Sequence, residues 1–170
     1  MQLQTYHSHI NEHDDLIGSA QRLANAFERG LRAARKGRRR FTGEAAARLD
    51  DGYSISAIYN KSAPVYARIL LNGRRYAEAS FYANGVLDRI EVYSGARKNG
   101  LFVSFNQDGL LQELGEHKDG KIDGKVFYFT NEPSIYTIVT YDRGHLRGML
   151  PSPAAISLLF NHLGNQAQSN

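Results

Sequence analysis

The segment between Asp14 and Lys36 has the hydrophobic spacing of an amphipathic helix. Its apolar residues recur every three or four positions, which places them on one side of a helix. These residues are Leu16, Ala20, Leu23, Phe27, Leu31 and Ala34. Asp14 and Asp15 lie in the expected first turn, where negative charge suits the positive end of the helix dipole. The spacing therefore predicts a helix over residues 14–36.

A short helical piece is expected directly after this helix. The stretch Phe41–Leu49 is rich in alanine, and Thr42 is a residue type that caps helix N-termini well. The turn residues of 50–52 then end it. We therefore predict a helical segment over 14–49, preceded by a flexible N-terminus at 1–13.

Residues 50–152 have the pattern of a β-sheet. Tyrosine, isoleucine, valine and phenylalanine become frequent, and glycine-containing turns separate runs of strand length. The runs are Leu87–Tyr93, Leu101–Phe105, Leu110–Glu116, Lys125–Phe129 and Ile135–Tyr141. Turn signals include Asn84-Gly85, Lys98–Gly100, Gln107–Gly109 and Lys118–Gly120, because Asn-Gly and Asp-Gly supply the positive φ angles of tight hairpins. We predict a meander of antiparallel strands.

The sheet region also repeats itself with a period of about 24 residues. Phe81–Ser104, Phe105–Tyr128 and Phe129–Ser152 align on their first phenylalanine, and a degenerate earlier copy covers 72–82. Further positions that coincide are Gly100, Gly124 and Gly148, and also Tyr93, His117 and Tyr141. Such a period predicts hairpin units that each pack on their neighbours.

One of these units carries a family resemblance. The segment Glu116–Phe129, with the sequence EHKDGKIDGKVFYF, resembles the MORN-type repeat and is similar to its bacterial antitoxin-like variants. The resemblance covers roughly residues 72–152 and is strongest over Phe105–Phe129. It implies a single-layer, twisted antiparallel sheet whose faces serve as a scaffold for protein or lipid contacts, without a catalytic signature.

The end of the chain predicts a cap for this sheet. Ser152 and Pro153 precede an apolar pattern that closes at Gly164, which is typical of a short helix over 153–164 with a tail at 165–170. The expected fold class is α+β: an antiparallel β-meander of repeated hairpins with an N-terminal amphipathic basic helix and a short C-terminal capping helix.

Positive charge is concentrated at the end of the N-terminal helix and just beyond it. The chain has a net charge of +4, but residues 22–40 hold eight cations against one anion, Glu28. The cations are Arg22, Arg29, Arg32, Arg35, Lys36, Arg38, Arg39 and Arg40, and those from Arg29 onward are the candidate partner-binding or anion-binding residues. Three interpretations stay open: dipole matching with ordinary solvation, a contact surface for an anionic partner, and a disordered connector.

Candidate catalytic chemistry is sparse. Residues 7–15 include three histidines and two aspartates, which are metal-ligand types, but a terminal segment supports a coordination sphere poorly. Lys118–Lys125 lacks the phosphate-loop pattern and joins strands. His117 and His145 lie beside turns and are expected at the surface. We predict a non-enzymatic protein with no catalytic residues, no metal site and no cofactor.

Composition limits the compartment and the organisation. The 170 residues are 42% hydrophobic and 22% charged, as in an ordinary globular protein, so a single domain over 1–170 with one core is expected. The absence of cysteine excludes a disulfide framework. The polar first residues are unlike a signal peptide, and no apolar run is long enough to span a bilayer. A cytoplasmic protein without a transmembrane segment is the expectation.

Two functional hypotheses follow. The first is a protein-interaction module that binds, and would neutralise, a partner such as a toxin or host factor through the MORN-like sheet. Tyrosine gives interfaces large contact area at little entropy cost, although it also forms strands and packs cores. The candidate sheet-surface contacts are Tyr93, His117, Tyr128 and Tyr141. The alternative is nucleic-acid binding through the basic helix Arg22–Arg40. Unpaired sheet edges also permit a homodimer.

Overall fold

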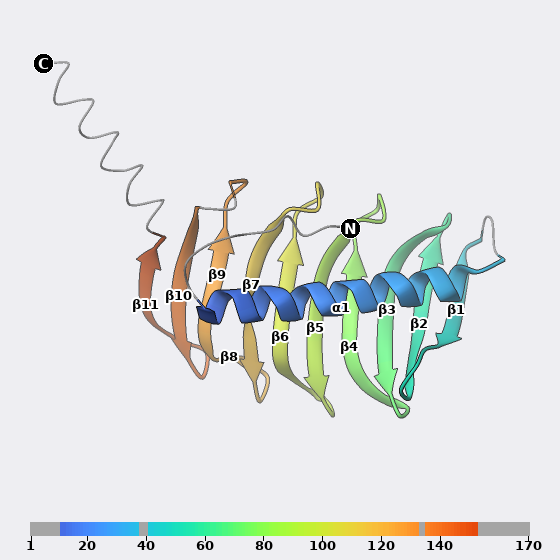
Figure 1. Cartoon of the computed structure of the whole chain (residues 1–170), viewed down its shortest axis with the longest axis horizontal. Coiled ribbons are helices and arrows are strands. Elements are labelled where there is room, and N and C mark those ends of the chain that lie inside the picture. The colour runs from blue at the N-terminus through green and yellow to red at the C-terminus, as the bar shows by residue number, and fades with distance from the viewer. Residues whose placement is uncertain (1–10, 38–40, 133–134, 153–170) are drawn as a thin grey trace, which may run out of the picture.

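The computed structural model describes residues 11–37, 41–132 and 135–152 of the chain. Over these residues the chain forms one helix, α1 (Asn11–Arg35), and one sheet of eleven strands (Figure 1). The strands are β1 (Gly43–Arg48), β2 (Tyr53–Asn60), β3 (Ala63–Leu71), β4 (Arg74–Phe81), β5 (Leu87–Ser94), β6 (Arg97–Phe105), β7 (Leu111–Lys118), β8 (Lys121–Ile122), β9 (Gly124–Phe129), β10 (Tyr136–Asp142) and β11 (His145–Pro151).

The sheet is a nearly unbroken antiparallel meander. Each strand pairs with its neighbours in the sequence, except that the two-residue β8 pairs with β7 at its end and β9 takes the next place beside β7. The α+β class, the N-terminal helix and the antiparallel meander expected from the sequence are therefore confirmed.

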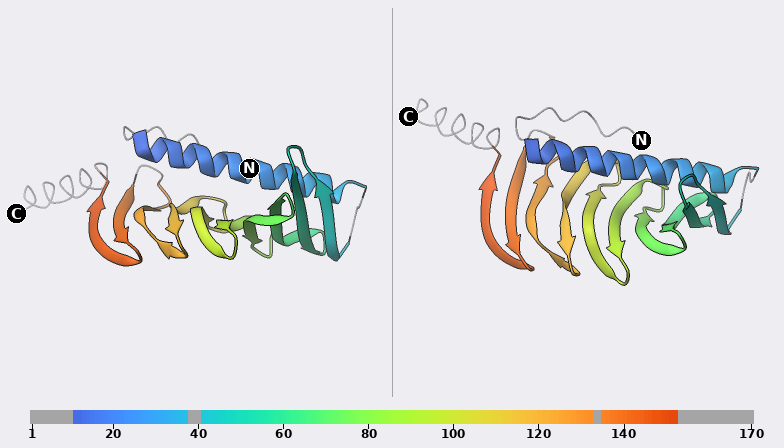
Figure 2. Two further views of the ribbon diagram at one scale, coloured as in Figure 1. Left: turned by 90° about the horizontal axis from the view of Figure 1, so that it is seen from below. Right: turned by 60° about the horizontal axis from the view of Figure 1, so that its bottom comes forward.

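Helix α1 lies along one face of the sheet and crosses the strands from β7 to β1 (Figures 1 and 2). Its buried stripe includes Ala20, Leu23, Ala24, Phe27 and Ala34. This is the apolar stripe that the three-and-four spacing predicts, since those positions lie on one side of a helix. The helix ends at Arg35, and Gly37 follows with a left-handed φ of 80°.

The core lies between α1 and the sheet, and its side chains change size along the sheet. Strands β1 to β4 contribute mainly alanines, namely Ala45, Ala57, Ala67, Ala77 and Ala79. Strands β5 to β10 contribute leucine, isoleucine and aromatic residues, including Leu87, Ile90, Phe105, Leu114 and Phe127. A Cβ added to Gly30 of the helix would lie 2.7 Å from Cδ1 of Ile55 in β2. The helix therefore approaches the alanine-rich strands closely, and small side chains are needed there.

The tight turns at one end of the strands have the geometry that their sequences predict. Asn72 and Gly73 have φ angles of 50° and 76°, and Asp119 and Gly120 have 52° and 86°. Two successive positive φ angles match the twist of adjacent strands, which is why Asn-Gly and Asp-Gly occur there. At the opposite end, the backbone N–H of Tyr82 donates to the carbonyl of Val86 and closes the turn after β4.

Two local predictions are wrong. Residues 41–49 are not helical, because Gly43–Arg48 forms β1 and pairs with β2 from Gly43↔Tyr59 to Arg48↔Ser54. Ala45 and Ala47 point toward the core while their neighbours are exposed, so strand pairing overrides the helix propensity of alanine. Lys98–Gly100 is not a turn but part of β6, since the chain reverses at Gly95 and Ala96.

Other boundaries shift or fall elsewhere. The helix begins at Asn11 rather than 14, and the sheet begins at Gly43 rather than 50. Of the flexible terminus expected at 1–13, residues 1–10 lie outside the described residues. The expected C-terminal helix at 153–164 and the tail at 165–170 also lie outside them.

Candidate functional site

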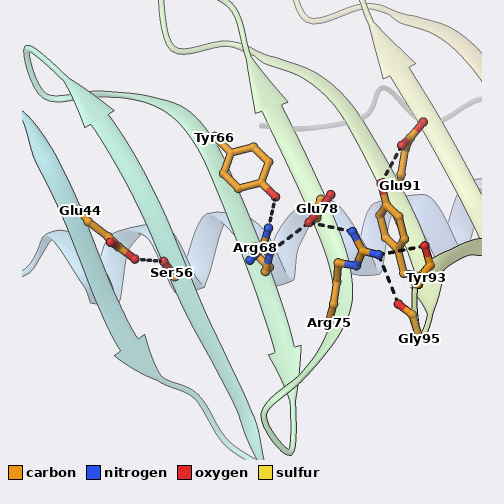
Figure 3. A network of polar contacts seen from close by, with 10 residues as sticks. Glu44, Ser56, Tyr66, Arg68, Arg75, Glu78, Glu91, Tyr93 and Gly95 are labelled. Carbon is orange, nitrogen blue, oxygen red and sulfur yellow. Dashed lines mark hydrogen bonds and ion pairs between the residues drawn. The ribbon is translucent and has the colours of Figure 1, made fainter.

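The sheet has one face that α1 does not cover, which we call the open face. In Figure 3 the open-face side chains stand in front of the strands and the helix runs behind them. The strand register lines these side chains up in rows: Ser56 of β2 opposes Arg68, Arg68 opposes Glu78, and Glu78 opposes Glu91. Because side chains alternate between faces along a strand, the polar rows and the apolar core lie on opposite sides of the same strands.

Glu78 is the centre of the first polar cluster on the open face. Its Oε1 accepts from Arg68 Nε at 2.9 Å and from Arg75 Nη1 at 3.4 Å, and Arg68 also donates to the Tyr66 hydroxyl at 3.1 Å (Figure 3). Burial opposes ionisation of Glu78, but hydrogen bonds from Tyr66 and Arg68 outweigh it and hold the pKa of this carboxyl below its usual value. Two guanidinium groups therefore share one carboxylate, and the cluster is net positive.

Arg75 links this cluster to the next strands. Its guanidinium lies 3.9 Å from the centre of the Tyr93 ring, and its Nη2 donates to the carbonyls of Gly95 and Ala96 at 3.3 and 3.0 Å. A cation over an aromatic face and two carbonyl acceptors hold this side chain in a single position. The β5–β6 turn is thereby tied to β4.

Glu91 is the centre of the second cluster. It accepts from Lys98 Nζ at 2.7 Å, Arg89 Nε at 3.0 Å and the Tyr93 hydroxyl at 3.1 Å, and its side chain is only 13% exposed. Burial by itself would raise the pKa of Glu91. The ammonium of Lys98 and the guanidinium of Arg89 lower it by more than burial raises it, so the pKa lies below its usual value. Arg89 also donates to Glu113 at 3.1 Å, which extends the network to β7.

The open-face tyrosines are neutral hydrogen-bonding groups. Burial, reinforced by the nearby carboxylates of Glu91 and Glu78, raises the pKa of Tyr93 well above its usual value. Burial also raises the pKa of Tyr128, whose hydroxyl lies 3.4 Å from that of Tyr141. The phenols of Tyr93 and Tyr128 therefore stay protonated at physiological pH and remain available as donors and acceptors.

His117 is not at the surface, contrary to the prediction. It is 8% exposed, opposes Gly100 of β6, and its ring centre lies 4.7 Å from that of Phe102. Burial lowers the pKa of His117, and among the described residues its Nδ1 has no hydrogen-bond partner. His145, by contrast, is exposed as expected.

The predicted basic residues lie on a different side of the molecule. Arg29 and Arg35 are exposed on α1, Lys36 is exposed directly after it, and Arg32 forms an ion pair with Glu28 at 2.8 Å while remaining 79% exposed. Arg38, Arg39 and Arg40 lie outside the described residues. The structure thus separates the basic helix from the open face by the thickness of the sheet and does not bring the two candidate sites together.

A trough along one flank of α1 was not predicted. It has a volume of about 750 Å³ and is lined by Arg22 and Arg29 of the helix, by Asp50 and Asp51, and by Tyr53 and Tyr76. The two tyrosine rings meet edge to face at 5.6 Å. No sequence pattern indicates this trough, because its walls come from strands that meet only in the folded sheet.

The described residues contain neither a metal-ligand cluster nor a helix that could cross a membrane. Within 11–37, 41–132 and 135–152, no group of three or more histidine, aspartate or glutamate side chains is placed to hold a metal ion. In the same part of the chain, no helix has the length and apolar character needed to cross a membrane.

Comparisons with known proteins identify no family. No protein-family model matches the sequence, and a search of curated proteins gives no significant match. Among solved structures, similarity is found to a GtfA/B complex, with 11% identity over 74% of this chain and a TM-score of 0.37. A TarM mutant from S. aureus, in complex with fondaparinux, alpha-GlcNAc-glycerol and UDP, matches with 7% identity over 90% of this chain and a TM-score of 0.26. The chain spans 23% and 34% of those two chains, and scores this low carry no inference.

Proposed function

We propose that this chain is a non-enzymatic protein-interaction module that binds a protein partner through the open face of its sheet. The observation that supports the proposal is the network of Arg, Glu and Tyr side chains on this face, which continues from β3 to β7 without a helix over it among the described residues. Arginine and tyrosine are enriched where proteins contact one another.

The network suits binding because its side chains are already fixed. Arg75 and Glu91 each have three or more hydrogen-bond or ring partners, so they lose little conformational freedom when a partner docks. The first cluster is net positive and the tyrosines are neutral, so we expect the partner to present carboxylates toward Arg68 and Arg75. The partner, as in the first sequence hypothesis, is a protein such as a toxin or host factor.

The proposal includes the 24-residue, MORN-like repeat. The hydrogen bond that closes the turn after Phe81, from Tyr82 N–H to the Val86 carbonyl at 2.8 Å, has a counterpart 24 residues later. There, Asn106 N–H donates to the Leu110 carbonyl at 2.9 Å. Equivalent turns at this spacing support a scaffold in which each unit presents the same face.

A matched pair of arginine variants tests the binding face. Arg68 on the open face and Arg32 on the helix each form one ion pair with a glutamate, at 2.9 and 2.8 Å. We expect Arg68→Glu to lower the recovery of the partner in a pulldown from lysate at least tenfold, because like charges then meet at the interface. Arg32→Glu should leave the recovery unchanged.

The same pulldown names the partner and measures the consequence of binding. A stoichiometric protein band that survives nuclease supports the proposal, and assaying that protein with and without this chain shows whether binding neutralises it. Equal loss of the band in both arginine variants would contradict the open-face assignment.

Nucleic-acid binding is the second candidate, and one observation favours it. Arg22 and Arg29 of α1 and Lys36 directly after it are exposed at seven-residue spacing, and within the described residues none of them forms an ion pair. Nuclease-sensitive recovery that falls with salt, with a log–log slope of about −0.9 per phosphate contact on duplex DNA, would support this function. Changing Arg29, Arg35, Lys36, Arg38, Arg39 and Arg40 to glutamine should then abolish binding.

A further inference from the structure

The last strand of the sheet, β11, has an unusual set of exposed side chains. Among the described residues it pairs only with β10, so its other edge is free of them. Leu146, Met149 and Leu150 are 62%, 65% and 67% exposed, and among the described residues only one other large hydrophobic side chain, Ile58, is exposed. Apolar side chains beside unpaired backbone groups form a template for a further strand.

The other edge of the sheet is protected, which makes β11 distinctive. Strand β1 carries the exposed charges of Glu44 and Arg48 and packs against α1. Charged side chains and a covering helix are common ways of blocking edge pairing. On β11 the charged side chain nearest to the exposed hydrophobic residues is that of Arg147. Asp142 of the same hairpin neutralises it through an ion pair of 2.6 Å.

The backbone groups at the free edge can be assigned from one hydrogen bond. Ser152 N–H donates to the Tyr136 carbonyl of β10 at 2.7 Å. Because the N–H and C=O groups of successive strand residues point to opposite sides, those of Leu150 also point toward β10. Those of Met149 therefore point outward, and Pro151, which has no N–H, occupies the next outward position. Proline at such a position leaves no donor unsatisfied.

We infer that β11 pairs with β11 of a second copy of this chain, antiparallel about a twofold axis at Met149. In this register Met149 and Met149 of the partner subunit exchange two N–H···O bonds. Leu150, which opposes Ile138 on the helix side, then lies against Gly148 of the partner subunit, where there is space for it.

The axis stands perpendicular to the sheet, so the two sheets join into one and both open faces point the same way. The inference goes beyond the proposed function, because edge pairing does not depend on what the open face binds. One strand from each copy makes a small interface, so we expect a dimer that dissociates in the micromolar range.

Single cysteines test the register, since the chain has none of its own. Paired Cα atoms in a hydrogen-bonded antiparallel pair are about 5.5 Å apart, within the range that a disulfide bridges. Met149→Cys should therefore form a covalent dimer under mild oxidation. Leu150→Cys is the matched control: the two copies of residue 150 are two positions out of register, so their Cα atoms are about 8 Å apart, beyond disulfide reach. Equal cross-linking of both variants, or none in either, would overturn the register.

Sedimentation equilibrium tests the dimer without covalent chemistry. The average mass of the full chain should rise with concentration from 19.0 kDa toward twice that value. Met149→Pro removes the outward N–H without removing a hydrogen bond to β10, and it should stay at the mass of one chain while circular dichroism shows the sheet intact. Glu44→Ala, on the opposite edge, should dimerise like the unchanged protein. A protein that stays monomeric throughout, or a Met149→Pro variant that dimerises equally well, would refute the inference.

Discussion

The two faces of this sheet are stabilised in different ways although they belong to the same strands. The face under α1 holds the apolar core, and residues such as Ala57, Ile90 and Val103 are fully buried in it. The open face is held by cross-strand ion pairs and ring contacts around Glu78 and Glu91. Burial of apolar area is the larger stabilising effect, while partly exposed ion pairs contribute little each. The helix side therefore contributes most of the stability, whereas side chains of the open face can change at a smaller cost.

The strongest test of this comparison removes a large core side chain of α1. Phe27 is 1% exposed, so Phe27→Ala should lower the free energy of unfolding by about 3–5 kcal/mol, because it leaves a cavity between helix and sheet. Urea unfolding followed by circular dichroism measures the loss. Arg29→Ala, on the exposed side of the same helix, should change stability by less than about 0.5 kcal/mol. Similar losses in both variants would mean that the helix does not anchor the sheet.

A smaller effect is expected where the helix touches β2. Gly30→Ala places a Cβ 2.7 Å from Ile55 Cδ1 and should lower the free energy of unfolding by about 1–3 kcal/mol. Adding Ile55→Val removes that methyl group, so the double variant should regain part of the lost stability. Gly18→Ala is the control, since its Cβ would meet only the flexible end of Arg22. It should stabilise the helix by up to about 1 kcal/mol. Thermal unfolding of the three variants and the unchanged protein gives the signs directly.

The open face should respond more weakly. Glu91→Gln removes the carboxylate charge shared by Lys98 and Arg89, and we expect a loss of about 1 kcal/mol at pH 7. The pKa of Glu91 is lowered in the folded state, so its contribution is present above its unfolded pKa of about 4.3 and lost as pH falls through the folded value. The stability difference between the variant and the unchanged protein should therefore shrink in acid.

A control separates this carboxylate from others. Glu116→Gln removes an exposed carboxylate and should leave the stability unchanged at every pH. If Glu116→Gln matched Glu91→Gln, the ion-pair network would not be the source of the effect.

The smallest effect concerns His117. Burial lowers the pKa of its imidazole. The charge of Glu91 opposes this shift, and the charges of Lys98 and Arg89 add to it. The imidazole is therefore protonated more readily in the unfolded chain than in the folded one. The contribution of His117 is present above its unfolded pKa of about 6.5 and is lost as pH falls through the lower folded value. His117→Leu should flatten the stability profile between about pH 7 and 5 by less than 1 kcal/mol, measured by urea unfolding at several pH values. His145→Leu, at an exposed position, should not alter the slope.

Much of the fold could be predicted because its signals are local. The apolar spacing that includes Leu23 and Phe27 predicts the buried side of α1, and Asp-Gly at Asp119 predicts a tight turn. The strand β1 was missed because its alanines favour a helix in isolation, and only pairing with β2 decides otherwise. Local propensity is overridden wherever a neighbouring strand is available.

The candidate site was less accessible to prediction. Tyr93 was identified, but Arg68, Arg75, Glu78 and Glu91 were not, since they lie on three different strands that only the register brings together. Alternation of polar and apolar residues along β3, β4 and β5 is the signal that was available for them. His117 was placed at the surface because its neighbours in sequence are polar, whereas the ring of Phe102 on the adjacent strand packs against it.

The position of α1 across the strands has a consequence for synthesis of the chain. The helix leaves the ribosome before the strands of this sheet, yet it packs on β6 and β7, the latter of which ends some 80 residues later. At the usual rate of translation, the apolar side of the helix waits on the order of ten seconds for its last partners. During that interval a chaperone would bind the apolar side of the helix around Leu23 and Phe27. The growing meander would then displace the chaperone strand by strand.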